Sequence, residues 1–132
     1  CKWNSDVCTK AAEKGHLSTL VWARDNGCEW NKNVCIVAAA YDHLPILIWA
    51  RVNGCEWDKK VCTLATQYGN LSILMWAQEN DCPWDKSICC IAATYGHLNI
   101  LKWARKNKYP WNEQKCLQVC YKQNIYNWIK SQ

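Results

Sequence analysis

Residues 28–54 read CEWNKNVCIVAAAYDHLPILIWARVNG, and this pattern returns with the same length at 55–81 and 82–108. Two columns of tryptophan and one of cysteine carry the period: Trp3, Trp30, Trp57, Trp84 and Trp111; Trp22, Trp49, Trp76 and Trp103; Cys8, Cys35, Cys62, Cys89 and Cys116. A second cysteine column consists of Cys1, Cys28, Cys55 and Cys82, with Tyr109 in the fifth place. Such self-similarity is typical of a solenoid. We therefore predict one array of units 1–27, 28–54, 55–81, 82–108 and 109–132.

The composition is that of a globular protein, since 50% of the 132 residues are hydrophobic and 20% are charged. The net charge of +5 permits an acidic partner. A nucleic-acid-binding protein would more often crowd basic residues on one face, so we expect no nucleic acid. No signal peptide opens the chain, and no run approaches the roughly 18 apolar residues of a membrane helix. We therefore expect no membrane association.

The eleven cysteines do not indicate a disulfide scaffold. Their number is odd, no secretory signal precedes them, and most sit at equivalent positions of successive units. Stacked helices lie about 8–10 Å apart, whereas a disulfide needs Cα atoms within about 7 Å, so cysteines of one column should not bridge. We interpret them as small buried groups in an intracellular reducing compartment, the cytoplasm.

Each unit predicts two helices, which in the second unit cover residues 32–41 and 44–53. A column of Asn and Asp precedes the first helix and predicts its N-caps: Asn4, Asn31, Asp58, Asp85 and Asn112. The turn column Gly15, Asp42, Gly69 and Gly96 predicts a positive φ. Gly27, Gly54 and Asp81 predict the same backbone after the second helix, and Lys108 breaks that column. The fold class is therefore all-α, a helix-turn-helix solenoid.

Residues 38–44, AAAYDHL, and 92–98, AATYGHL, resemble the Ala-Ala-x-x-Gly-His-Leu core of ankyrin repeats. The resemblance covers nearly the whole chain and recurs four or five times. An ankyrin unit has about 33 residues, so about six are missing here, where the β-hairpin finger belongs. The Gly-Cys-x-Trp-Asp variant is similar to ankyrin-like arrays of giant DNA viruses and some protists. This resemblance implies an ankyrin-like solenoid without fingers, located in a host-cell cytoplasm or a virion.

Two apolar columns become polar in the terminal units. They are Lys10, Val37, Leu64, Ile91 and Gln118, and Thr19, Ile46, Ile73, Ile100 and Asn127. Solenoids need polar outer faces on their terminal repeats, so we interpret these changes as caps, with residues 109–132 forming the C-terminal one.

The sequence offers no catalytic constellation, and we expect no enzyme, cofactor or small-molecule substrate. Structural zinc sites usually pair ligands two to four residues apart, which is absent, so we expect no metal. His16, His43 and His97 become Asn70 in the third unit, which favours turn and cap residues over ligands. We place the tryptophans in the core rather than on a base-stacking platform. Arg24, Arg51 and Arg105, with Gln78 in their column, are interpreted as a solvated helix face.

The resemblance to ankyrin repeats implies partner binding by the residues that follow the alanine pair. Tyrosines stand there one unit apart, and tyrosine is favoured at interface hot spots. We predict a partner-binding stripe of these tyrosines and the lysines near them: Lys14, Tyr41, Tyr68, Tyr95, Lys32, Lys59, Lys60 and Lys86. The alternative is that the tyrosines only cover helix ends.

The expected function is thus a protein-interaction or scaffold module that binds an acidic or mixed surface of another protein. Two alternatives stay open at this point. One is a structural component of a virus particle, and the other, less favoured, is a nucleic-acid-binding array.

Overall fold

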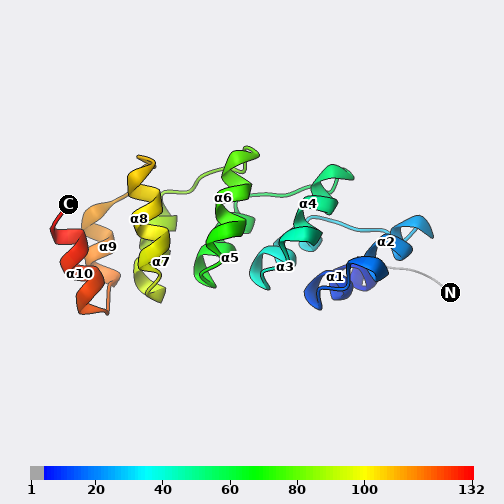
Figure 1. Cartoon of the computed structure of the whole chain (residues 1–132), viewed down its shortest axis with the longest axis horizontal. Helices are drawn as coiled ribbons and strands as arrows, with labels where there is room; N and C mark the ends of the chain where they lie inside the picture. The colour runs from blue at the N-terminus through cyan, green and yellow to red at the C-terminus, as the bar shows by residue number, and fades with distance from the viewer. Residues whose placement is uncertain (1–4) are drawn as a thin grey trace.

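The computed structural model describes residues 5–132, so predictions about Cys1, Trp3 and Asn4 fall outside the described part. Within that part the chain is entirely helical, which confirms the predicted all-α solenoid. The helices are α1 (Ser5–Glu13), α2 (Leu17–Asp25), α3 (Asn33–Ala40), α4 (Leu44–Val52), α5 (Lys60–Gln67), α6 (Leu71–Glu79), α7 (Ser87–Tyr95), α8 (Leu98–Lys106), α9 (Glu113–Val119) and α10 (Gln123–Lys130). Figure 1 shows them following one another in chain order from one end of the molecule to the other. Among residues 5–132, no helix has the length and apolarity needed to cross a membrane.

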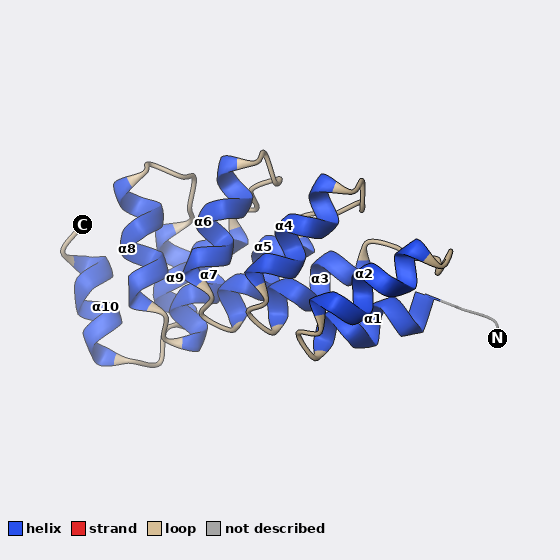
Figure 2. Ribbon diagram, turned by 45° about the vertical axis from the view of Figure 1, so that its right-hand side comes forward, coloured by secondary structure: helices blue, strands red, loops and turns tan. Residues whose placement is uncertain are grey.

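Each unit is a pair of helices, and the units stack through their first helices. Helix α3 contacts α1 on one side and α5 on the other, and α7 likewise lies between α5 and α9. The second helices pack mainly against the first helix of their own unit. The short turns inside the units lie along one edge of the array and the longer loops between units along the other (Figure 2). We call these the turn edge and the loop edge.

Small residues allow the first helices to approach one another closely. The alanine pairs Ala38-Ala39 and Ala92-Ala93 are buried, as is Ala65-Thr66 in the third unit. The Thr66 hydroxyl donates a hydrogen bond to the Cys62 carbonyl at 2.7 Å, so its burial leaves no polar atom unsatisfied. Leucines and isoleucines of the second helices complete the core, and each contributes about 1.5–3 kcal/mol by burial. Examples are Ile46, Leu47, Ile73, Leu74, Ile100 and Leu101.

In the first four units, both helices end through a left-handed residue, as the sequence predicts, whereas α9 and α10 do not. Asp42 has φ of 63°, and the His43 amide donates to the Ala38 carbonyl at 2.8 Å, which is a Schellman motif. The second helices end in the same way. Lys108 was expected to break this pattern, which was wrong: it adopts φ of 59°, and the Tyr109 amide donates to the Ala104 carbonyl.

The first helices begin slightly later than predicted. Helix α3 starts at Asn33, so Lys32 rather than Asn31 occupies the N-cap by position. The predicted capping chemistry is nevertheless present, because Asn31 Oδ1 accepts a hydrogen bond from the Asn33 amide at 2.9 Å. Asp58 and Asp85 do the same for the amides two residues ahead, and Asn112 caps α9 as predicted.

Lys10, Gln118, Thr19 and Asn127, the polar residues that were predicted to cap the array, do not act as simple caps. Val37, Leu64 and Ile91 are only half-buried, so this column lies on the open face of the first helices rather than in the seam between units. The second column fails for another reason. Because α9 is shorter than the other first helices, α10 begins sooner after α8 than α8 does after α6, and Ile125 rather than Asn127 matches Ile100. Ile125 is buried, as Ile100 is.

Candidate partner-binding edge

Three tyrosines occupy equivalent places on the turn edge. Tyr41 and Tyr68 follow the last residue of α3 and α5, and Tyr95 is the last residue of α7. Their exposed fractions are 55%, 58% and 51%. Such exposure shows that the rings do not seal the helix ends, and it leaves them available for contact with another molecule.

The open face of the first helices continues the surface that the tyrosines begin. Val37, Leu64 and Ile91 each precede one of these tyrosines by four positions. Side chains four positions apart lie on the same face of a helix. Because all three are half-buried, each unit presents an aliphatic side chain beside an exposed phenol ring. We call these six residues the tyrosine surface.

Behind the tyrosines, one side chain ties each of the second, third and fourth units to the preceding one. The His43 Nε2 atom lies 3.0 Å from the Glu13 carbonyl oxygen, and the His97 Nε2 atom 2.9 Å from that of Gln67. The Asn70 side-chain amide donates to the Ala39 carbonyl at 2.8 Å. These residues were expected to act at the start of their own helix, but they reach the end of the preceding unit's first helix instead.

The turn glycines are explained by this contact as well as by their positive φ. A Cβ atom at Gly69 would lie 2.8 Å from His97 Cε1, and one at Gly15 would lie 2.7 Å from His43 Cε1. The imidazole therefore needs a glycine in the preceding turn. Asp42 carries a Cβ atom, and the unit that follows it has the shorter Asn70 in place of histidine. The replacement of the turn glycine by Asp42 and the replacement of the histidine by Asn70 thus occur at the same junction.

Two further residues extend the turn edge. Lys14 stands in the tyrosine column in the first unit and lines a hollow of about 440 Å³, together with Val7, Lys10 and His16. Tyr121 lies in the turn between α9 and α10 and is 85% exposed. Tyr121 was not predicted because α9 ends earlier in its unit than the other first helices do, and this tyrosine stands one position ahead of the column that contains Tyr95.

The predicted stripe does not form one surface, because most of its lysines lie on the loop edge. Lys32, Lys59 and Lys86 directly precede the first helices, whereas the tyrosines stand at the other end of the same helices. An eight-residue helix separates its ends by about 12 Å. Lys60 is the first residue of α5 and therefore also belongs to the loop edge.

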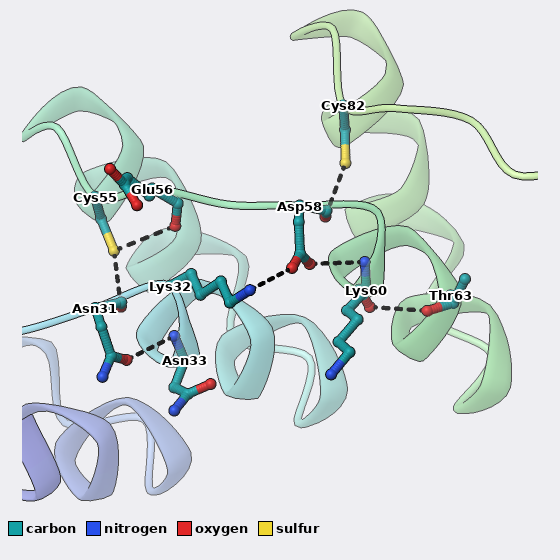
Figure 3. Close-up of polar contacts among 9 residues, drawn as sticks. All are labelled: Asn31, Lys32, Asn33, Cys55, Glu56, Asp58, Lys60, Thr63 and Cys82. Atoms are coloured by element: carbon teal, nitrogen blue, oxygen red, sulfur yellow. Dashed lines mark hydrogen bonds and ion pairs between the residues drawn. The ribbon is translucent and has the colours of Figure 1, made fainter.

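Two of these lysines link neighbouring units. Lys32 Nζ lies 3.0 Å from an Asp58 carboxylate oxygen, and Lys59 Nζ lies 3.3 Å from one of Asp85 (Figure 3 shows the first pair). Hydrogen bonds from the backbone and side chain of Ser87, aided by Lys59, hold the pKa of Asp85 below its ordinary value. Partial burial raises the pKa of Asp58, but Lys32 and the Lys60 amide outweigh it and the pKa is lowered. These lysines therefore serve the array itself.

Most of the described tryptophans are half-buried and pack against the core at the loop edge, and Trp22 is 54% exposed, so their predicted place in the core is only partly correct. Trp30 and Trp49 meet edge to face with ring centroids 5.5 Å apart, and Trp57 and Trp76 do so at 5.7 Å. Trp84 instead stacks on Tyr109 at 4.2 Å with 15° between the planes. Each tryptophan pair lies within one unit, whereas Trp84 and Tyr109 belong to neighbouring units, and all these rings pack against the core.

The arginine column is not a solvated face, which corrects the prediction. Arg51 donates to the Cys55 carbonyl and lies 4.3 Å above the Trp57 ring, and Arg24 repeats both contacts with Cys28 and Trp30. Arg105 lies over Trp111 in the same manner. The Gln78 amide keeps the hydrogen bond, to the Cys82 carbonyl at 3.0 Å, without a cation above Trp84.

The cysteines of residues 5–132 are buried, apart from the half-buried Cys120, and no disulfide joins two of them. In the same range no group of three or more His, Cys, Asp or Glu side chains is arranged to hold a metal ion. Burial raises the pKa of the Cys89 thiol to about 12. Such a thiol is protonated at neutral pH and is a poor nucleophile.

Comparison with known proteins adds no assignment. A scan against models of protein families gives no match, and a search of curated proteins finds no similar sequence.

Proposed function

We propose that the array is a protein-interaction module that binds another protein along the tyrosine surface. The observation that carries the proposal is the recurrence of one exposed tyrosine, at an equivalent place, in three consecutive units. Exposed apolar groups that gather in a row, rather than scattering singly, mark interaction sites, and tyrosine is enriched at interface hot spots.

The chemistry of the surface indicates the kind of partner. Each of the three central units offers a phenol hydroxyl, which can donate or accept a hydrogen bond, beside an aliphatic side chain. Lys14 adds a positive charge at the N-terminal end of the row, and the net charge of the chain is +5. A partner segment with apolar residues and some acidic groups is complementary to this arrangement. The resemblance of residues 92–98 to the ankyrin core supports the same proposal.

The first experiment compares the wild-type chain with the Tyr41→Ala/Tyr68→Ala/Tyr95→Ala variant as baits in quantitative affinity capture from the source cells. Tyr126→Ala is the matched control, since this tyrosine lies on α10 away from the tyrosine surface. We expect partners retained by the wild type and the control to be lost from the triple variant. A purified partner should then bind Tyr68→Ala at least about 10-fold more weakly.

The same variants test whether the tyrosines are structural. Because the three rings are more than half exposed, the triple variant should keep its helical circular-dichroism spectrum and its melting temperature. Loss of the fold would contradict the proposal. So would binding that is unchanged in the triple variant, or that falls steeply with added salt, since the latter indicates contacts with nucleic-acid phosphates.

A further inference from the structure

The junction between the first two units contains two thiols in close contact. Cys8 belongs to α1, and Cys28 follows α2 at the start of the second unit. Their Sγ atoms are 2.9 Å apart, and both residues are fully buried. A disulfide bond has an S–S length of about 2.05 Å, so the sulfurs need to approach by less than about 1 Å to form one.

The next two junctions repeat this arrangement. Cys35 and Cys55 have the same separation in sequence as Cys8 and Cys28, and their thiols lie close enough to shift each other's pKa, upward for Cys35 and downward for Cys55. Cys62 and Cys82 form the third pair in the same way. In each pair one cysteine comes from a first helix and the other from the loop that begins the following unit. Each pair therefore joins a member of the Cys8 column to a member of the Cys28 column. The predicted distance between cysteines of one column could not reveal such pairs.

The last junction keeps a thiol pair although one column is lost there. Tyr109 stands where the pattern calls for a cysteine, and this leaves Cys89 without its counterpart. At the same junction the chain has an additional cysteine, Cys90, at a position that is Ile36 in the second unit. Cys90 Sγ lies 3.0 Å from Cys116 Sγ in α9. All four junctions thus contain one close pair, formed in two different ways.

We propose that these four pairs are sites of oxidation, at which a peroxide converts facing thiols into disulfides that join successive units. One thiolate attacks a peroxide oxygen and becomes a sulfenic acid, and hydroxide leaves. The partner thiol attacks the sulfenic sulfur, the S–S bond forms, and water leaves. Per pair, two thiols lose two electrons and two protons, and hydrogen peroxide is reduced to two molecules of water.

The fold selects these pairs over other combinations. The cysteines are held by helices α1, α3, α5, α7 and α9 or by loop residues that complete a Schellman motif, as when the Cys55 amide donates to the Ala50 carbonyl at 2.9 Å. Cys55 Sγ also reaches back to the Asn31 carbonyl at 3.3 Å, which directs its thiol toward the preceding unit (Figure 3). Burial raises the pKa of Cys8 to about 12, with its contact to Cys28 as a further cause, so reaction needs local opening and is slow.

The test oxidises the folded full-length chain with hydrogen peroxide, then unfolds it with excess N-ethylmaleimide and measures its intact mass. Four disulfides use eight of the eleven cysteines, so three alkylated residues are expected. Proteolysis without reduction should yield the Cys8–Cys28, Cys35–Cys55, Cys62–Cys82 and Cys90–Cys116 peptide pairs. The oxidised chain should stay monomeric and helical, with a melting temperature at least about 5 °C higher that dithiothreitol reverses.

Two variants make the result specific. Cys55→Ala should lose the disulfide to Cys35 and keep the other three, whereas Cys89→Ala should keep all four. Several outcomes would overturn the proposal: disulfides in other combinations, disulfides formed only in urea, or oxidation to sulfinic acid without cross-links. Equal loss of disulfides in both variants would also overturn it, since that result would report general destabilisation.

Discussion

The turn edge and the loop edge hold neighbouring units together by different means. At the turn edge, one imidazole or amide at each of the first three junctions bonds a backbone carbonyl of the preceding unit, as His97 does with Gln67. At the loop edge, each junction has a thiol contact, three of the four add a cation or a stacked ring across the junction, and the two central ones add an ion pair such as Lys59 with Asp85. The loop edge thus uses many weak contacts where the turn edge uses one specific hydrogen bond.

This contrast separates stability from recognition within the same units. On the loop edge, Trp57 is occupied on one side by Trp76 and on another by Arg51. On the turn edge, the hydrogen bond to the carbonyl lies behind Tyr68, whose ring is left exposed. A partner bound to the tyrosines would therefore not compete with contacts that hold the array together.

The largest expected effect comes from a glycine pair that differs only in its surroundings. Gly69 and Gly54 have φ of 76° and 84°, but a Cβ atom meets His97 at Gly69 and nothing within 4 Å at Gly54. Gly54→Ala should cost about 1 kcal/mol of unfolding free energy from backbone strain. Gly69→Ala should cost about 3 kcal/mol, because it also displaces the imidazole from the Gln67 carbonyl.

Chemical denaturation of both variants measures the two costs. A Gly69→Ala/His97→Asn double variant serves as the control, because it copies the Asp42–Asn70 junction. It should recover part of the stability that Gly69→Ala loses. Equal costs at Gly54 and Gly69 would show that the imidazole contact does not constrain the turn.

The sequence predicted the architecture because a repeat exposes its own pattern. The left-handed turn residues, both helices of each unit and the alanine packing follow from columns that keep their chemistry, such as Gly15, Asp42 and Gly69. The cap assignment failed at Asn127 because α9 is shorter than the other first helices, and a fixed period cannot reveal such a change.

The candidate site was predicted less completely, because a repeated residue in the sequence does not show how deeply its side chain is buried or which way it points. Tryptophans beside Leu and Ala were placed in the core, yet the helix ends at the loop edge leave Trp49 half-buried. The arginines were missed because their partner is a backbone carbonyl, which has no sequence signature. The length of α5 alone would have separated Lys59 from Tyr68, since the two residues flank this helix at opposite ends.

At the loop edge the arginine contact gives the next largest effect. Arg51→Ala removes the hydrogen bond to the Cys55 carbonyl and the cation above Trp57, and should cost about 2 kcal/mol. Arg51→Gln should cost about 1 kcal/mol, because Gln78 shows that an amide in this column still bonds the carbonyl. Urea denaturation measures the free energy of unfolding of both variants. If Arg51→Gln is as unstable as Arg51→Ala, the hydrogen bond to the Cys55 carbonyl does not contribute separately from the cation above Trp57.

A stabilising substitution is expected at Lys108, which stands where the first two units have Gly27 and Gly54. Lys108 adopts φ of 59°, which strains a residue with a Cβ atom. Lys108→Gly removes that strain but increases the entropy of the unfolded chain, so the net gain should be at most about 1 kcal/mol. The matched control is Lys102→Gly, at an exposed position inside α8, which should destabilise by about 1 kcal/mol. Thermal melts of the two variants should therefore shift in opposite directions.

The smallest effect concerns the ion pair between Lys59 and Asp85. Because the pKa of Asp85 is lowered in the folded chain, its stabilisation is present above the ordinary aspartate pKa of about 4 and is lost as the pH falls through the lower folded value. Asp85→Asn still accepts the Ser87 amide hydrogen bond, as Asn112 does for Lys115, so its cost at pH 7 should be below about 1 kcal/mol. Its stability should also fall less than that of the wild type between about pH 5 and 3. A double-mutant cycle with Lys59→Gln measures the coupling energy between Lys59 and Asp85. If this coupling energy does not become smaller in acid, the lowered pKa of Asp85 is due to the Ser87 hydrogen bonds alone.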